Sequence, residues 1–192
     1  MKFSARRLEI PEVIELEVHR FGDERGFFSE TYNREQLREV GIEVDFVQDN
    51  HSLSGDTGTL RGLHFQLAPF AQDKLVRVTK GSVFDVAVDI REGSSTFGKW
   101  VGVEISAKKW NQLFVPKGFA HGFVTLEPDT EFLYKVSSPY AAEAEGAIRF
   151  DDPDIGVAWP LKDGVEPVLS AKDKIAPLLR DLDVSTFNFG TF

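Results

Sequence analysis

Short runs of β-branched and aromatic residues, separated by Gly, Asp, Asn and Pro, dominate the chain from Ile10 to Ile105. Such punctuated runs are typical of antiparallel sandwiches and barrels. Between residues 83 and 90 the larger apolar residues recur at every second position, which gives this run one apolar face. Several other runs are apolar on both faces, as expected where two sheets pack together. The pattern therefore predicts an all-β chain.

The strand candidates include Ile14–Val18, Phe27–Thr31, Phe46–Ser52, Leu75–Thr79, Ser82–Ile90, Lys99–Ile105, Asn111–Val115, His121–Thr125 and Thr130–Val136. One helix is predicted between Asn33, which can cap it, and Gly41, which ends it. A second helix starts near Ser170, and Pro177 should break it within about two turns. No repeat or linker divides the 192 residues, so we expect a single domain of β-barrel type over residues 1–192.

Composition narrows the environment and the partners. The chain has no cysteine, which excludes disulfides and a thiol nucleophile and fits a reducing compartment. Its formal charge of -9 disfavours a broad nucleic-acid surface, because such binding rests on many Lys and Arg contacts to phosphates. Neither a signal peptide nor an apolar run of about 20 residues is present in the sequence. We expect a cytoplasmic protein that binds neither nucleic acid nor membrane.

Two of the four histidines, His64 and His121, each lie near glycine in an apolar, strand-like run. Such a histidine either fills a core position or is held inside a barrel for chemistry. Arg61 lies three positions before His64, opposite in the pleat, and Lys74 and Arg77 belong to the next strand candidate. If these two strands form a hairpin, histidine and cations converge at one barrel mouth; a solvated charged rim is the alternative.

Metal and cofactor sites have no sequence support. Small barrels often hold iron, zinc or manganese through His-x-His and a carboxylate, but His64 is followed by Phe65 and Gln66. There is also no Gly-x-Ser-x-Gly and no Gly-rich phosphate loop before a helix. We therefore expect no metal and no cofactor, and any phosphate would be held by arginine.

Longer motifs follow one another along nearly the whole chain: Phe21-Gly22-Asp23-Glu24-Arg25-Gly26-Phe27-Phe28-Ser29-Glu30, Phe46-Val47-Gln48-Asp49-Asn50-His51-Ser52, Leu60-Arg61-Gly62-Leu63-His64-Phe65-Gln66, Gln72-Asp73-Lys74-Leu75-Val76-Arg77-Val78, Val115-Pro116-Lys117-Gly118-Phe119-Ala120-His121-Gly122-Phe123, Tyr134-Lys135-Val136, Asp151-Asp152-Pro153 and Leu169-Ser170-Ala171-Lys172-Asp173. In content and order they closely resemble the dTDP-4-dehydrorhamnose 3,5-epimerase family. The departures are mild: Phe150 stands where that family favours tryptophan, Ala142 where proline is commoner, and Leu67-Ala68 where two prolines are frequent.

The resemblance implies a cupin-type jelly-roll β-barrel with a few short helices. It also implies an activity: inversion of C3 and C5 of dTDP-4-dehydro-6-deoxy-D-glucose to give dTDP-4-dehydro-L-rhamnose, a step in dTDP-L-rhamnose biosynthesis. Both protons flank one carbonyl and are acidified by it. Inverting each carbon requires a base on one face, an acid on the other and a partner for the enolate oxygen.

The resemblance also assigns the catalytic groups. His64 would be the base, with Asp173 orienting its imidazole. Tyr134 would be the acid, and Lys74 the cation near the keto oxygen. Without the family, Asp173 reads as the capping-box partner of Ser170, and Tyr134 as an ordinary strand aromatic.

The remaining site residues come from the same resemblance. His121 would line the sugar pocket, and Glu145 and Lys172 are further candidates. Substrate-binding roles are thus implied for Arg25 and Arg61 at the diphosphate, for Glu30, Gln48 and Asn50 at the thymidine end, and for Phe27 by stacking on the base. Family members are homodimers with exchanged N-terminal strands, which implies that Arg25 or Phe27 serves the neighbouring subunit's site.

Three alternatives stay open at this stage. The first is a single-site epimerase or a keto-isomerase of the same fold, which would share the catalytic set. The second is a non-catalytic cupin that only binds a nucleotide sugar. The third is a metal-dependent oxygenase or isomerase, which the missing His-x-His disfavours.

Overall fold

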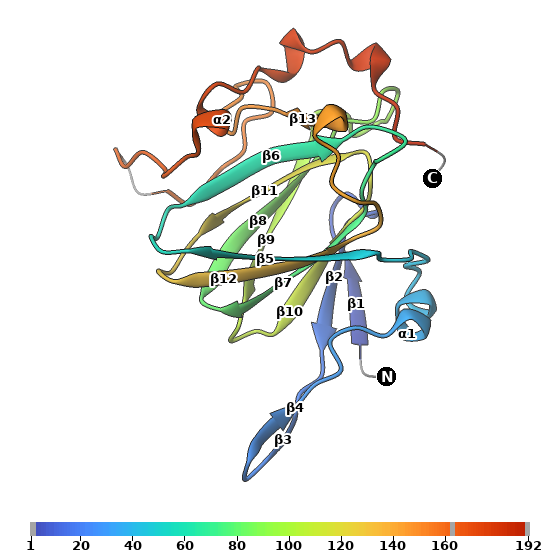
Figure 1. Ribbon diagram of the computed structural model, residues 1–192, viewed down its shortest axis with the longest axis vertical. Helices are drawn as coiled ribbons and strands as arrows, with labels where there is room; N and C mark the ends of the chain where they lie inside the picture. The colour runs from blue at the N-terminus through green and yellow to red at the C-terminus, as the bar shows by residue number, and fades with distance from the viewer. Residues whose placement is uncertain (1–2, 162–163, 191–192) are drawn as a thin grey trace.

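Two antiparallel sheets face each other in the computed structural model, which describes residues 3–161 and 164–190 (Figure 1). The first sheet has the order β1 (Phe3–Arg7), β2 (Ile14–Val18), β10 (Asn111–Val115), β7 (Lys74–Lys80), β12 (Thr130–Val136) and β5 (Gln48–Ser54). The second has the order β13 (Glu145–Ala147), β6 (Leu60–Gln66), β11 (Phe119–Thr125), β8 (Ser82–Asp89) and β9 (Trp100–Ser106). Neighbouring strands that are far apart in sequence are characteristic of a jelly roll.

Apolar clusters lie between the two sheets and on the outer face of each. Between them, Val76 and Phe132 of the first sheet pack with Ala87 and Phe123 of the second in one buried cluster. The outer face of the first sheet packs against Leu37. The C-terminal segment after β13 covers the outer face of the second sheet and runs above β6 in Figure 1. Burial on both faces explains why these strands read as continuous apolar runs.

Most predicted strands are confirmed. Three have the expected bounds, namely β2, β10 and β12, and β5, β7, β8, β9 and β11 differ only at their ends. The prediction of a strand over Phe27–Thr31 is wrong: only Gly26–Phe28 forms β4, because the chain then leaves its partner strand and leads to the first helix. The strands β1, β13 and β3 (Phe21–Asp23) were not expected, and β6 coincides with the strand-like run around His64.

Both predicted helices are present. The Asn33 side chain caps α1 (Arg34–Glu39) by accepting hydrogen bonds from two backbone N–H groups, and Gly41 follows with φ +86°. Ser170 caps α2 (Ala171–Lys174), which ends before Pro177. Short 3₁₀ turns at Ala142–Ala144, Leu179–Asp181 and Val184–Thr186 complete the elements. The prediction of an all-β, cupin-type jelly roll with a few short helices is confirmed.

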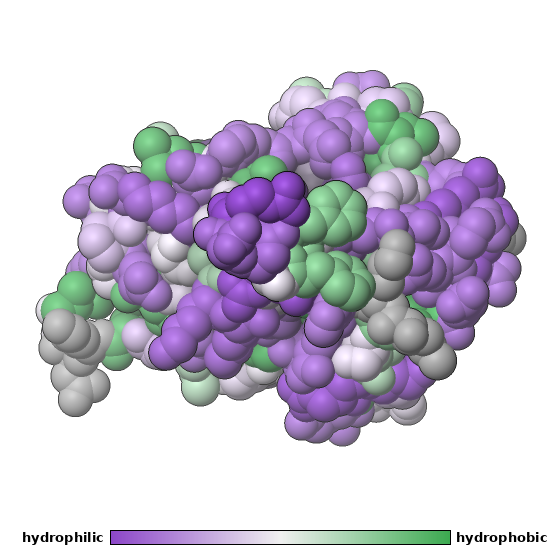
Figure 2. Space-filling model, turned by 90° about the horizontal axis from the view of Figure 1, so that it is seen from below, coloured by the Kyte–Doolittle hydropathy of each residue, from purple (hydrophilic) through white to green (hydrophobic). Residues whose placement is uncertain are grey.

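The hairpin of β3 and β4 projects away from both sheets, at the lower end of the molecule in Figure 1. Its phenylalanines are exposed: Phe21 by 46%, Phe27 by 55% and Phe28 by 66%. Seen from below, this face carries hydrophilic residues interrupted by separate hydrophobic patches (Figure 2). Within the described ranges, no helix is long and apolar enough to cross a membrane.

Candidate active site

A cavity of about 350 Å³ opens between the two sheets. Strands β5, β7 and β12 of the first sheet, β6 and β11 of the second, and helix α2 supply its lining. The lining residues are Asn50, His51, Ser52, Arg61, His64, Lys74, His121, Phe123, Phe132, Tyr134, Ser170 and Asp173. All four predicted catalytic residues and three of the predicted substrate-binding residues, Asn50, Arg61 and His121, therefore share one cavity.

A β-bulge in β6 brings Arg61 and His64 to the same side. His64 pairs with His121 of β11, and Arg61 pairs with Phe123, so β6 holds one residue more than β11 over this stretch. One extra residue reverses the alternation of side chains. The expectation that Arg61 lies opposite His64 in the pleat is therefore wrong, and both side chains line the cavity.

The prediction of a hairpin after His64 is also wrong. The predicted convergence of His64 with nearby cations is nevertheless largely correct. Strands β6 and β7 belong to different sheets, and Lys74 meets His64 because the two inner faces oppose each other. Arg77 does not join them. It lies in a second cavity of about 390 Å³ with Glu30, Asp49 and other residues.

His64 and Asp173 form a hydrogen-bonded pair, with 2.5 Å between His64 Nε2 and Asp173 Oδ1. The Asp173 side chain is only 3% exposed and also accepts a hydrogen bond from the Ser170 hydroxyl at 2.8 Å. Burial favours the neutral acid, but the hydrogen bonds from His64 and Ser170 outweigh it, so the pKa of Asp173 lies below its usual value. Asp173 thus takes both parts considered from the sequence, as partner of His64 and in the cap of α2.

Lys74 is a nearly buried cation in the lining of the cavity. Its ammonium donates to the backbone oxygen of His64 at 3.4 Å, and burial lowers the pKa of Lys74 to about 8, although the charges of Asp85 and Glu145 oppose this. The ammonium therefore stays mostly charged at neutral pH and loses its proton as the pH rises through about 8. A cation with this environment can stabilise a developing oxyanion and can also exchange its proton.

His121 pairs with a fully buried carboxylate. Its Nε2 lies 2.8 Å from Asp85 Oδ1, and burial lowers the pKa of His121 despite the attraction of Asp85. Burial likewise raises the pKa of Asp85, although His121 and Lys74 oppose the shift. Asp85 Oδ2 has no hydrogen-bond partner among the described protein atoms. The sequence analysis did not single out Asp85. The feature that could have revealed it is a charged residue among the inward-facing residues of β8, a strand buried on both faces.

Tyr134 faces His64 from the other sheet. Burial raises the pKa of the Tyr134 phenol, the charge of Arg61 opposes this, and Glu145 adds to it. The phenol is therefore neutral at physiological pH and able to donate its proton. The Arg61 guanidinium is held at the β5 edge by the Ser54 hydroxyl and the Leu53 carbonyl, each at 3.3 Å.

Glu145 of β13 and Lys172 of α2 form an ion pair, and Lys172 precedes Asp173 in the chain. The Tyr140 hydroxyl donates to the same carboxylate at 3.0 Å. Burial opposes ionisation, but the hydrogen bonds from Lys172 and Tyr140 dominate, and the pKa of Glu145 lies below its usual value. The Gln48 side chain donates a hydrogen bond to the Asn50 side chain at 2.8 Å, and Asn50 lines the cavity.

Six predicted substrate-binding residues are absent from the lining of this cavity: Gln48, Glu145 and Lys172, described above, and Arg25, Phe27 and Glu30. Arg25 is at the tip of the projecting hairpin, where its side chain is 85% exposed and pairs with Asp23. Phe27 in β4 stacks edge-to-face on Trp110 at 5.1 Å between ring centroids. The carboxylate of Glu30 accepts from Asn33 and from Gln36, both at 2.8 Å.

Two aromatic rings in the cavity were also missed as site residues. Phe123 and Phe132 stack face to face with centroids 4.0 Å apart, one from each sheet. Both are apolar residues of strands, and nothing in the sequence distinguishes a phenylalanine in a cavity wall from one in the core. Among the described residues there is no group of three or more His, Cys, Asp or Glu placed to hold a metal ion.

The jelly-roll barrel, with its histidine–aspartate pair and a neutral tyrosine on facing sheets, belongs to the class of cupin-type sugar epimerases. The family model for dTDP-4-dehydrorhamnose 3,5-epimerase matches residues 7–181. A dTDP-4-dehydrorhamnose 3,5-epimerase of Salmonella typhimurium is 56% identical over 171 residues, which cover 88% of this chain and 92% of that protein. The chain therefore belongs to the dTDP-4-dehydrorhamnose 3,5-epimerase family.

Solved structures of sugar epimerases also resemble this chain. The epimerase RmlC from Legionella pneumophila, in complex with dTDP-4-keto-L-rhamnose, superposes with a TM-score of 0.92 at 43% identity and covers 99% of this chain and 100% of its own. ChmJ, a 3'-monoepimerase from Streptomyces bikiniensis in complex with dTDP-quinovose, has a TM-score of 0.83 at 35% identity, covering 90% of this chain and 86% of its own. The predicted family, fold and epimerase activity are confirmed, and the roles of individual residues stay predictions.

Proposed function

We propose that the chain inverts C3 and C5 of dTDP-4-dehydro-6-deoxy-D-glucose, with His64 as base and Tyr134 as acid. The observation that carries this assignment is their placement: the two side chains reach one cavity from facing sheets, as removal and return of a proton on opposite faces of a ring requires. The 2.5 Å contact with Asp173 occupies His64 Nε2, which leaves Nδ1 to receive a proton from the sugar.

Each inversion then follows the same sequence of proton transfers. His64 removes the proton from a carbon next to the keto group, and the electron pair moves to the keto oxygen to form an enolate. The ammonium of Lys74 stabilises this oxygen. Tyr134 returns a proton to the opposite face of the same carbon, and both side chains recover their starting protonation by exchange with solvent. The imidazolium of His64 is stabilised meanwhile by the ionised Asp173.

The substrate's diphosphate and nucleoside account for the remaining candidates. Arg61 lines the cavity and offers a guanidinium that suits a phosphate. Glu145 and Lys172, next to Asp173, would bind toward the same end of the substrate, and Gln48 and Asn50 toward its thymidine. A local set of cations explains how a protein with a formal charge of -9 would bind a dianionic ligand.

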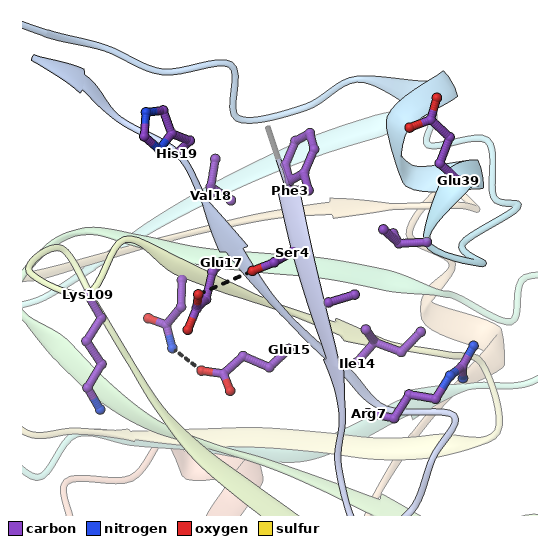
Figure 3. A pocket seen from close by; sticks show the side chains of 13 residues that line it. Phe3, Ser4, Arg7, Ile14, Glu15, Glu17, Val18, His19, Glu39 and Lys109 are labelled. Atoms are coloured by element: carbon purple, nitrogen blue, oxygen red, sulfur yellow. Dashed lines mark hydrogen bonds between the residues drawn. The ribbon is translucent and has the colours of Figure 1, made fainter. Parts of the chain in front are cut away.

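A homodimer with exchanged N-terminal strands would complete this site. Arg25 and Phe27 lie on a projecting hairpin outside the cavity of their own chain, and the hairpin exposes three phenylalanines. Next to it, a cavity of about 1000 Å³ is lined by β1, β2 and α1, with Glu15, Glu17 and Lys109 among its side chains (Figure 3). A second copy that covers this region would bury the hairpin and bring Arg25 to the partner's diphosphate. A cytoplasmic location fits the cysteine-free composition.

An NMR time course in deuterated water tests the proposed reaction. Purified protein is mixed with dTDP-4-keto-6-deoxy-D-glucose and a chelator, and a reductase traps the product. Deuterium at both C3 and C5 together with L-sugar supports the double epimerase. Exchange at one carbon would instead indicate a single epimerase, which the likeness to the 3'-monoepimerase ChmJ makes the second candidate. No exchange at either carbon would contradict both.

A further inference from the structure

The described residues that line the catalytic cavity have polar side chains, with two exceptions. They carry hydroxyl, amide, phenol, imidazole, ammonium, guanidinium or carboxylate groups, and the exceptions are Phe123 and Phe132. These two rings are 5% and 1% exposed, and both also belong to the buried cluster between the sheets. They therefore form the floor of the cavity, where it meets the core.

The floor is a rigid apolar surface. The rings of Phe123 and Phe132 lie 4.0 Å apart at an interplanar angle of 19°, and the His121 imidazole stacks on Phe132 at 6.2 Å. Tyr134, two residues from Phe132 on the same strand face, has its ring 5.9 Å away. Packing from both sheets prevents either ring from turning aside to admit a polar group.

A 4-keto-6-deoxy sugar has a matching asymmetry. Its ring bears hydroxyls, a keto oxygen, a ring oxygen and the diphosphate, and its single apolar substituent is the C6 methyl on C5. C5 is one of the two carbons at which Tyr134 is proposed to act, and Tyr134 adjoins the floor. Burying a methyl against the rings is favourable, whereas a C6 hydroxyl there would lose its hydrogen bonds to water.

We propose that the Phe123–Phe132 floor receives the C6 methyl and makes the enzyme specific for 6-deoxy sugars. The proposal rests on the sugar placement given under the proposed function. Phe123 and Phe132 act here as specificity determinants, with no part in proton transfer. A hydrophobic pocket discriminates against an added hydroxyl by up to about 100-fold, which sets the scale of the expected effect.

Binding of two stable nucleotide sugars tests the floor without chemistry. dTDP-6-deoxy-D-glucose and dTDP-glucose differ only in the C6 hydroxyl, and their Kd values can be compared by calorimetry. We expect the 6-deoxy ligand to bind about tenfold more tightly or better. dTDP alone serves as the reference: if it binds while the two sugars have equal Kd values, the floor proposal is overturned and the nucleotide site stands. If dTDP itself fails to bind, the proposed substrate class fails as well.

A matched pair of variants separates polarity from volume. Leu and Asn are similar in shape, so Phe123→Leu shortens the floor and keeps it apolar, while Phe123→Asn makes it polar. The ratio of the two Kd values should persist in Phe123→Leu and fall below about threefold in Phe123→Asn. Equal ratios in the two variants would contradict the proposal.

A second readout needs no variant and covers the case in which Phe123→Asn does not fold. In protein protonated only at phenylalanine, the C6 methyl of bound dTDP-6-deoxy-D-glucose should give NOEs to phenylalanine ring protons. If the anomeric and ribose protons show that the ligand is bound but the methyl gives no NOE to phenylalanine, the methyl lies elsewhere and the proposal is overturned.

Discussion

At the scale of single residues, the site combines groups whose environments shift their proton affinities in different directions. Asp173 is held ionised by hydrogen bonds, Tyr134 is held neutral by burial, and the pKa of Lys74 is lowered to about 8. Such divergence among neighbouring titratable groups is typical of acid–base catalysis. The sequence placed all three as candidates through their motifs. It did not reveal Asp85, because a carboxylate within an apolar run looks the same whether it faces a core or a cavity.

Substitution of the proposed base and acid should have distinct consequences. His64→Ala should abolish deuterium exchange at C3 and C5, with a loss of kcat of about 10²-fold or more, because it removes the proposed base. Tyr134→Phe should still allow proton removal but fail to complete inversion. The measurement is the NMR time course, with circular dichroism to check that both variants fold. Full activity of His64→Ala would mean that the base is misassigned.

Asp85→Asn should change the pH dependence of the reaction. The Lys74 ammonium is the proposed active form, so kcat should fall as pH rises through about 8 in the unmodified protein. The negative charge of Asp85 raises the pKa of Lys74, and its removal should therefore shift the alkaline limb of the kcat profile to lower pH. Asp152→Asn, a buried aspartate outside the cavity lining, is the matched control. An unmoved alkaline limb in Asp85→Asn would argue against this coupling.

At the scale of elements, two local features bring the proposed catalytic groups together. The bulge in β6 turns Arg61 and His64 to one side, and the Ser170 cap starts α2 where Asp173 can reach His64. The cap follows from a local sequence pattern and was predicted. The bulge was not, because it exists only in the pairing of β6 with β11, residues that are far apart in the chain.

Gly62 allows this bulge, and its replacement should be severe. A Cβ at Gly62 would lie 2.5 Å from Gly122 Cα, and its φ of +127° disfavours any L side chain. Gly62→Ala should lower the free energy of unfolding by about 3 kcal/mol. Gly55→Ala is the control, since nothing lies within 4 Å of a Cβ there. Urea unfolding of both variants is the measurement, and equal stabilities would refute the close packing of β6 on β11.

Ser170→Ala should affect both stability and rate. Loss of the helix cap should cost about 1 kcal/mol. Loss of the hydroxyl that donates to Asp173 should also loosen the orientation of His64, with a fall in kcat of about tenfold and little change in KM. Ser185→Ala, which removes a hydroxyl bonded to Asp183 in an exposed 3₁₀ turn, should leave kcat unchanged. Thermal melts measure the stability and steady-state kinetics measure kcat. An unaltered kcat in Ser170→Ala would mean that this hydroxyl only caps the helix.

At the scale of the whole molecule, the cavity of one chain contains the proposed catalytic groups but not Arg25 or Phe27. The proposed homodimer predicts complementation between subunits. Neither Arg25→Ala nor His64→Ala should be fully active alone, but a mixed dimer contains one site with His64 from one chain and Arg25 from the other. Random mixing should restore about a quarter of the original activity. Light scattering gives the mass, and absence of any recovery in a proven mixed dimer would place Arg25 in its own chain's site.

The sequence by itself determined the strands buried on both faces, the two capped helices and the motifs that identify the family, because these depend on local periodicity and residue type. Only the tertiary structure decided that β6 and β7 lie in opposite sheets, that a bulge aligns Arg61 with His64, and that Arg77 is outside the catalytic cavity. It also decided that Phe123 and Phe132 meet across the barrel. These features arise from contacts between strands distant in the chain, and pairing register and facing side chains leave no trace in any local pattern.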